Sequence, residues 1–327
     1  MPTQFRKLGT LGALAAFMLV AGNAPAHAMP YPCSTLKIVS PYPAGGTTDI
    51  LARMLLPSLQ KSLGIPVIVD NKAGASSNIG TEFVGRAQPD GCTALLGNNT
   101  GVVINRNLYK LALDPVQALA PVVEVAAVPL VLYVNAAVTA KTVAELVSMV
   151  KANPGKYSFA SGGSGSPQHL AGELLKLQSN IDLLHVPYKG QGLALTDVIA
   201  GHVPIAFETT TVLLPQIHGG KVRPLATTDA RKSVTLPELP TMNSLGYTDF
   251  EITNWYGVFV PKATPKELVG RLNVAVRAAL ASPEITAKLT EMGSAKVDGT
   301  PEEFSGFIAR EIPRWEILVK KSHAKVE

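Results

Sequence analysis

The feature that most constrains the fold of this 327-residue chain is a repeated alternation of short apolar runs with longer amphipathic ones. In the first amphipathic run, which Gly64 terminates, the apolar residues recur at close to 3.6-residue spacing. Pro57 falls inside it, so we expect a kink or a break there. The alternation predicts strands over residues 36–41, 66–69 and 93–97 and helices over residues 48–63 and 79–87.

The same pattern continues to the C-terminus. Two apolar segments, 122–134 and 250–260, contain no helical pattern, and we interpret them as crossings between two lobes. Alternating strands and helices predict parallel sheets and an α/β fold. About 300 residues exceed what one core usually holds, so we assign residues 29–127 and 254–327 to lobe 1 and residues 128–253 to lobe 2. Further strands are expected over 157–160, 183–186, 203–207 and 222–227, and helices from 142, from 167, over 265–281, over 283–292 and over 300–322.

The N-terminus predicts a cleaved signal peptide over residues 1–28. Arg6 and Lys7 precede the uncharged apolar run Leu11–Gly22, and Ala26-His27-Ala28 provides the small residues that a signal peptidase accepts. This run is too short to span the roughly 30 Å of hydrocarbon in a bilayer. The prediction is therefore export to the periplasm, with an uncleaved anchor as the alternative.

Composition excludes some classes of partner. The chain is 46% hydrophobic and 16% charged, with a net charge of +5 to which Arg6 and Lys7 contribute two. Its basic residues are scattered, so nucleic acid is not an expected partner. The histidines do not have the spacing of metal ligands, and we predict no metal and no cofactor.

The two cysteines, Cys33 and Cys92, are a candidate disulfide because an oxidising compartment favours pairing. They precede the first and third predicted strands, which are neighbours in a sheet ordered 2-1-3. The alternative is two separate thiols.

Two glycine-rich loops each join a predicted strand to a helix. The first contains Tyr42, Ala44, Gly45 and Gly46, with Thr47 or Thr48 as the expected N-cap. The second contains Ser161, Gly163, Ser164 and Gly165, with Ser166 as N-cap and His169 in the first helical turn. Helix N-termini present unpaired N–H groups and the positive end of a dipole. One such terminus in each lobe would suit an anion with two ends.

Other readings of these loops are weaker. Glycine-rich turns also begin helices in many α/β proteins without binding anything. The second loop lacks the Gly-Lys-Ser/Thr of a phosphate loop, and Gln168 occupies the third glycine position of a dinucleotide motif. Ser164 is not flanked as the nucleophile of a hydrolase would be. Additional candidate ligand contacts follow strand ends: Asn98, Asn99, Tyr188, Lys189 and Glu208.

At these loops the sequence resembles the periplasmic substrate-binding proteins of tripartite tricarboxylate transporters, the Bug-type receptors. The resemblance includes Pro41–Asp49, Val69–Ala75, Pro89-Asp90-Gly91, Val186–Gly190 and Leu236–Thr241, in order and spacing. Two departures are Cys92 in place of a usual aromatic residue and Ser76-Ser77 in place of a more glycine-rich pair.

The resemblance implies a type II periplasmic binding protein in which two doubly wound parallel-sheet lobes close about a two-segment hinge. Backbone amides of the loop Tyr42–Thr48 would hold a ligand carboxylate, and residues 161–169 would close from the other side. It implies a non-enzymatic monomer that delivers a di- or tricarboxylate, an acidic amino acid or an aromatic acid to membrane transporter subunits. A sensor adaptor and a secreted α/β hydrolase are the alternatives.

Overall fold

The structure is a computed structural model that describes residues 31–294 and 297–326, together with Met1. The described residues from Tyr31 onward belong to one compact unit. The signal peptide predicted for residues 1–28 lies outside this range. Within the two described ranges, no helix combines the length and the apolar character needed to cross a membrane.

The first sheet begins with a parallel group in the predicted order. β1 (Leu36–Ser40) lies between β2 (Val67–Asn71) and β3 (Thr93–Asn98), and pairs with both in parallel. α1 (Thr47–Leu63) and α2 (Asn78–Gly85) connect these strands. The expected break at Pro57 is wrong, because α1 continues through it. Pro57 is exposed, so water can solvate the carbonyl that loses its N–H partner.

The second sheet has a similar parallel group. β5 (Ser158–Ser161) pairs in parallel with β6 (Leu184–Pro187) and β7 (Ile205–Thr209). α4 (Val143–Lys151) precedes this group, and β8 (Val222–Thr227) follows it. α5 (Pro167–Ser179), α6 (Gln191–Ala200) and α7 (Thr210–His218) follow β5, β6 and β7 respectively. The strands occur where the sequence predicts them, but α6 and α7 were not predicted.

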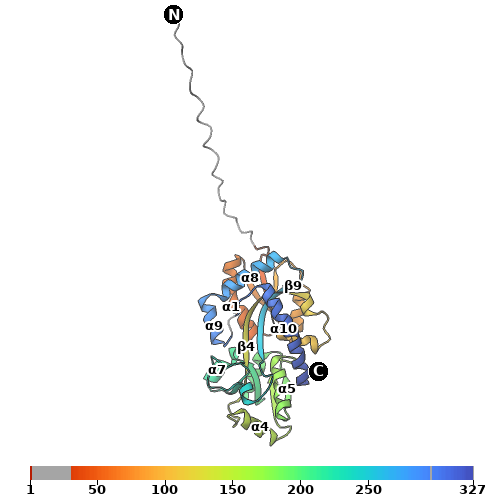
Figure 1. The fold of residues 1–327 in the computed structure, drawn as a ribbon, viewed down its shortest axis with the longest axis vertical. Coiled ribbons are helices and arrows are strands. Elements are labelled where there is room, and N and C mark those ends of the chain that lie inside the picture. Colours follow the sequence, from red (N-terminus) through yellow and green to blue (C-terminus); the bar gives the residue numbers. More distant parts are fainter. Residues whose placement is uncertain (2–30, 295–296, 327) are drawn as a thin grey trace. The chain divides into compact units, whose positions relative to one another are not determined.

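Two long strands join the sheets. β4 (Leu119–Asn135) pairs antiparallel with β9 (Thr253–Pro261) as far as Pro129, and from Leu130 onward with β7. β4 also pairs antiparallel with β8, and β9 with β3. Figure 1 shows β4 running lengthwise from the strands near α8 towards α7. The parallel pairing predicted within each group of strands is present, whereas the crossing strands β4 and β9 run antiparallel to their neighbours.

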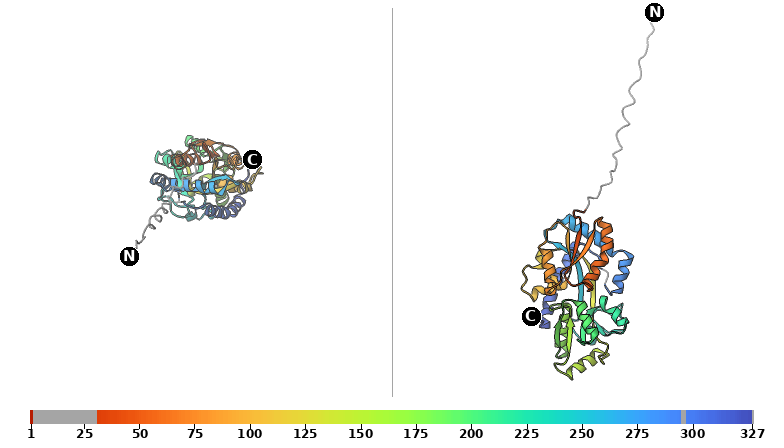
Figure 2. Two further views of the ribbon diagram at one scale, coloured as in Figure 1. Left: turned by 90° about the horizontal axis from the view of Figure 1, so that it is seen from above. Right: turned by 180° about the vertical axis from the view of Figure 1, so that it is seen from behind.

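The C-terminal helices return to the first sheet. These are α8 (Lys266–Leu280), α9 (Pro283–Glu291) and α10 (Pro301–Ser322). α10 begins with a capping box, in which Thr300 and Glu303 cap each other's backbone N–H groups. Buried Glu311 accepts hydrogen bonds from the indoles of Trp255 (2.9 Å) and Trp315 (2.7 Å). α10 lies in front of the strands in Figure 1, whereas β1–β3 and α1 (orange) face the viewer in the rear view of Figure 2.

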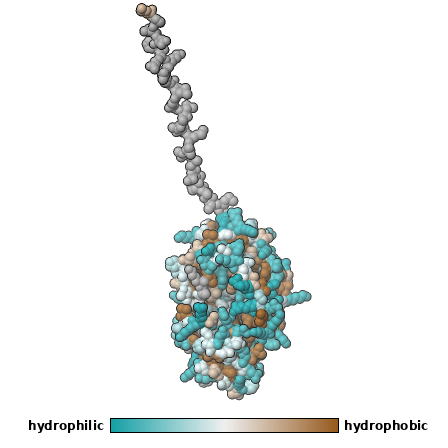
Figure 3. Space-filling model, in the orientation of Figure 1, coloured by the Kyte–Doolittle hydropathy of each residue, from teal (hydrophilic) through white to brown (hydrophobic). Residues whose placement is uncertain are grey.

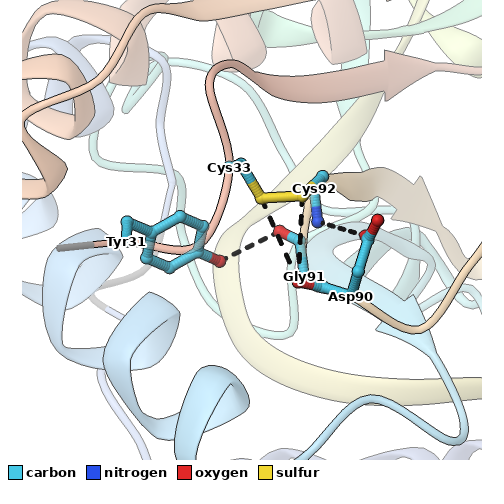
Figure 4. The surroundings of a disulfide bond; sticks show 5 residues. All are labelled: Tyr31, Cys33, Asp90, Gly91 and Cys92. Carbon is cyan, nitrogen blue, oxygen red and sulfur yellow. Dashed lines mark hydrogen bonds between the residues drawn. A yellow bond between two sulfur atoms is a disulfide. The ribbon is translucent and has the colours of Figure 1, made fainter. Parts of the chain in front are cut away.

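Cys33 and Cys92 form a disulfide with a Cα–Cα distance of 5.5 Å. Figure 4 shows the bond beside Gly91, whose carbonyl accepts a hydrogen bond from the Tyr31 hydroxyl at 3.0 Å. The Lys37 amide donates to the Cys92 carbonyl at 2.9 Å, so the disulfide joins the starts of two adjacent strands. The pairing predicted from the 2-1-3 strand order is present.

The remaining elements are short. They are α3 (Pro115–Ala118) and single turns at Ala75–Ser77, Thr100–Ile104, Asn105–Asn107 and Asn243–Leu245. On the face drawn in Figure 3, hydrophilic residues predominate and apolar residues are scattered among them. Scattered apolar side chains are normal on a surface in contact with water.

Candidate ligand-binding site

A pocket of about 270 Å³ lies between the loop that enters α1 and the first turns of α6. The loop contributes six predicted residues to its wall, and α6 contributes a set that the sequence analysis missed. The lining residues are Tyr42, Pro43, Ala44, Gly45, Gly46, Thr47, Thr48, Gly190, Gln191, Gly192, Leu193 and Thr196.

The first wall of the pocket is the N-terminus of α1. Gly46 is its N-cap, with φ −82° and ψ 167°, and no side chain caps the helix. The prediction of Thr47 or Thr48 as N-cap is wrong. Both lie inside the helix, and the Thr47 hydroxyl is 2.8 Å from that of Thr209 instead. The first N–H groups of α1 therefore lack both intrahelical and side-chain partners.

Asp49 fixes the shape of this loop. Its Oδ2 accepts hydrogen bonds from the Gly45 amide (3.0 Å) and the Arg53 Nε (2.9 Å), and its Oδ1 accepts from Asn71 (3.0 Å). Burial raises the pKa of Asp49, but the bonds from Arg53, Gly45 and Asn71 outweigh burial and lower it below its usual value. The Gly45 amide is thus already used, and the amides beyond it remain for a ligand.

The second wall of the pocket is the N-terminus of α6. Its N-cap is Gly190, and no side chain caps this helix either. Gly190 has φ +143°, which strains any other residue, and a Cβ there would lie only 3.0 Å from Pro43 Cδ, so Pro43 would have to shift slightly. The sequence Gly190-Gln191-Gly192 after a predicted strand was the available signal.

The second predicted loop does not line this pocket, and several of its backbone donors have partners within the loop. Ser166 caps α5 by accepting from the His169 amide, and the Gly165 amide donates to His169 Nδ1 at 3.1 Å. The Gly163 amide donates to the Ser161 hydroxyl at 3.2 Å.

The loop instead packs against the first turn of α6 and makes hydrogen bonds with residues of the predicted lobe 1. A Cβ on Gly162 would lie 3.2 Å from the Gln191 amide nitrogen, so the loop and α6 are in close contact. The Ser164 carbonyl accepts hydrogen bonds from the Ser76 hydroxyl (2.8 Å) and the Tyr109 hydroxyl (3.0 Å).

His169 and His185 stack behind this loop with ring centroids 3.9 Å apart. Burial lowers the pKa of His169 to about 4, with a smaller effect from Lys176. Burial, His169 and Lys176 together lower the pKa of His185 to about 3. His185 Nε2 is 2.7 Å from the Ser161 hydroxyl, but so weak a base is poorly suited to activating a nucleophile near neutral pH.

The other predicted contacts lie around the pocket rather than in its lining. Asn98 Nδ2 donates to the Tyr42 hydroxyl at 3.3 Å, and Asn99 Nδ2 donates to the Thr253 carbonyl at 3.0 Å. The Tyr188 hydroxyl donates to Asp197 at 2.6 Å, and Lys189 is exposed.

Glu208 lies behind the pocket, 1% exposed. Its Oε1 accepts from the Thr209 amide (2.7 Å) and hydroxyl (3.1 Å), and burial raises its pKa to about 7.

The sequence matches the family described as Tripartite tricarboxylate transporter family receptor over residues 51–323. The chain belongs to this receptor family. BugT of Bordetella pertussis is 36% identical, with 97% of this chain and 98% of BugT covered.

Two solved relatives of the family have the same fold. A Rhodopseudomonas palustris protein solved with adipate has a TM-score of 0.87 at 32% identity, covering 91% of this chain and all of that one. MatC from Rhodopseudomonas palustris, with bound malate, has a TM-score of 0.84 at 29% identity, covering 88% of this chain and all of MatC. These matches confirm the type II periplasmic binding-protein fold that the sequence predicts.

Proposed function

We propose that this protein is a periplasmic receptor that binds a small carboxylate in the pocket between α1 and α6. The observation that carries the proposal is the convergence of two helix N-termini, each with a glycine N-cap and no side-chain cap. The lining contains no Lys or Arg. Backbone N–H groups and helix dipoles are therefore the positive groups available to an anion.

The strength of such a site is reasonable for a transport receptor. A hydrogen bond to a charged group contributes about 1.5–3 kcal/mol, and a helix terminus adds about 0.3–2 kcal/mol. Leu193 and Pro43 give part of the wall an apolar character, which suits the carbon skeleton of an organic acid. The solved relatives with adipate and malate support this ligand class.

The pocket would close by movement of the two predicted lobes, 29–127 with 254–327 against 128–253. Support comes from β4, which exchanges β9 for β7 between Pro129 and Leu130. A monomer exported by the signal peptide at residues 1–28 would capture the acid without a cofactor. It would then deliver the acid to membrane transporter subunits.

A thermal-shift screen of the purified mature protein tests this function. The panel contains adipate, malate, citrate, aspartate and nicotinate, with adipamide as an uncharged control for adipate. We expect at least one acid to raise the melting temperature in a concentration-dependent way, because a ligand that binds only the folded state stabilises it. A panel in which no acid binds, checked by calorimetry, would contradict the proposal.

A further inference from the structure

Glu208 is a buried carboxyl group surrounded by neutral groups. It lies near the end of β7, and its Oε1 accepts from the Thr209 amide and hydroxyl. Among the described residues, the groups that shift its pKa include no Lys, Arg or His. Removing an ionised carboxylate from water without a cation is costly, so this environment favours the protonated acid.

The elements packed around Glu208 bring further buried polar groups. Gln168 from α5 lies beside the carboxyl group without a hydrogen bond of normal geometry, and both of its amide atoms are buried. The hydroxyls of Tyr133 on β4 and Tyr256 on β9 are also buried and make no hydrogen bond of normal geometry. These two tyrosines are the titratable groups that respond to the charge of Glu208.

Two threonine hydroxyls connect Glu208 to the pocket. The Thr209 Oγ1 lies 3.1 Å from Glu208 Oε1 and 2.8 Å from the Oγ1 of Thr47, a pocket-lining residue. Each hydroxyl has one proton to donate. While Glu208 is ionised, it draws the Thr209 proton towards itself, and Thr47 donates to Thr209. Once Glu208 is neutral, both threonine hydroxyls can reverse the direction of their hydrogen bonds. Thr209 then donates to Thr47, and Thr47 can donate towards the pocket.

We propose that Glu208 takes up a proton when the receptor captures its carboxylate, so that ligand affinity falls as pH rises. This inference rests on the proposed function. An anion in the pocket disfavours a second negative charge at Glu208 and thereby raises the pKa of that group. Because such coupling is reciprocal, protonation of Glu208 strengthens ligand binding by the same factor. Affinity for the ligand is then highest at pH values below the pKa of Glu208 in the free protein, about 7, and falls at higher pH.

Calorimetric titration with adipate and malate measures this coupling directly. Between about pH 6.5 and about pH 8.5 these acids are almost fully ionised, because carboxyl groups have pKa values near 4. We expect wild-type affinity to fall by about three- to tenfold across this range. Titrations in buffers of different ionisation enthalpy should give an uptake of between zero and one proton.

Three variants identify the group responsible. Glu208→Gln should bind with an affinity that does not change with pH and without proton uptake. Thr209→Val keeps Glu208 and the amide at position 209 but breaks the hydroxyl relay, so its pH dependence should be weaker.

Glu124→Gln is the matched control. Burial, assisted by Glu311, raises the pKa of Glu124 to about 7 as well, but Glu124 belongs to the α10 side of β4, so this variant should keep the wild-type pH dependence.

The outcomes separate the two proposals. Binding with constant affinity and no proton uptake overturns this inference alone, as does a wild-type pH profile in Glu208→Gln. Failure of every acid in the panel to bind overturns the proposed function and this inference together. If circular dichroism shows that Glu208→Gln does not fold, the wild-type titrations in buffers of different ionisation enthalpy decide, and the absence of proton uptake overturns the inference.

Discussion

Gln191 is the residue at which the proposed electrostatics can be tested with least disturbance of the fold. It lies in the first turn of α6 and lines the pocket. Replacing it with Glu keeps the shape and adds a negative charge where a helix tolerates one well. Repulsion of a ligand carboxylate at about 4 Å costs about 1–4 kcal/mol. We expect Gln191→Glu to lose about tenfold or more in affinity for the best acid of the panel, measured by calorimetry, with an unchanged melting temperature.

The matched control for Gln191→Glu is Gln117→Glu. Gln117 is exposed in α3, also near a helix N-terminus, and does not line the pocket. The same chemical change there should leave affinity unchanged. Equal affinity of wild type and Gln191→Glu would mean that the ligand carboxylate does not approach α6.

At the scale of elements, α6 depends on the backbone freedom of its N-cap. Gly190 has φ +143° and leaves only 3.0 Å between a Cβ and Pro43, whereas a Cβ on Gly192 meets nothing within 4 Å. We expect Gly190→Ala to lower the free energy of unfolding by about 1–3 kcal/mol. Gly192→Ala should raise it by up to about 1 kcal/mol, because alanine favours helix. Urea unfolding without ligand measures both, and equal effects would contradict the strained N-cap.

The sequence predicted the elements whose signals are local. Ser166 and Pro167 identify the start of α5, and Thr300 and Glu303 that of α10, because caps and first-turn residues act within one turn. The strand order 2-1-3 also correctly placed Cys33 beside Cys92.

Predictions that depended on contacts between distant residues were less successful. The loop at 161–169 contains the glycines expected of an anion site, yet Gly162 packs against Gln191 of α6 and the loop does not line the pocket. The role of Thr47 depends on Thr209, 162 residues away. Neither pairing has a local signature, so the sequence could indicate a helix-terminus site but not which second helix completes it.

At the scale of the whole molecule, contacts between the two proposed lobes should set the balance between open and closed forms. The Ser164 carbonyl belongs to lobe 2, and it accepts from Ser76 and Tyr109 of lobe 1. Neither donor lines the pocket. A ligand that binds the closed form must offset the free energy of closing, so weakening these contacts lowers affinity without touching the ligand.

Tyr109→Phe removes one of these bonds and leaves Ser164 paired with Ser76. A net hydrogen bond contributes about 0.5–1.5 kcal/mol. This free energy corresponds to about a two- to tenfold change in affinity, so we expect a loss of that size by calorimetry. The control is Tyr247→Phe, which loses the 3.1 Å bond from Ser179 within lobe 2 and should bind as wild type does. Small-angle scattering of Tyr109→Phe without ligand should show a larger radius of gyration than that of wild type. If Tyr109→Phe matched wild type in both affinity and dimensions, this contact would have no part in closure, because a bond that stabilises only the closed form cannot be lost without favouring the open one.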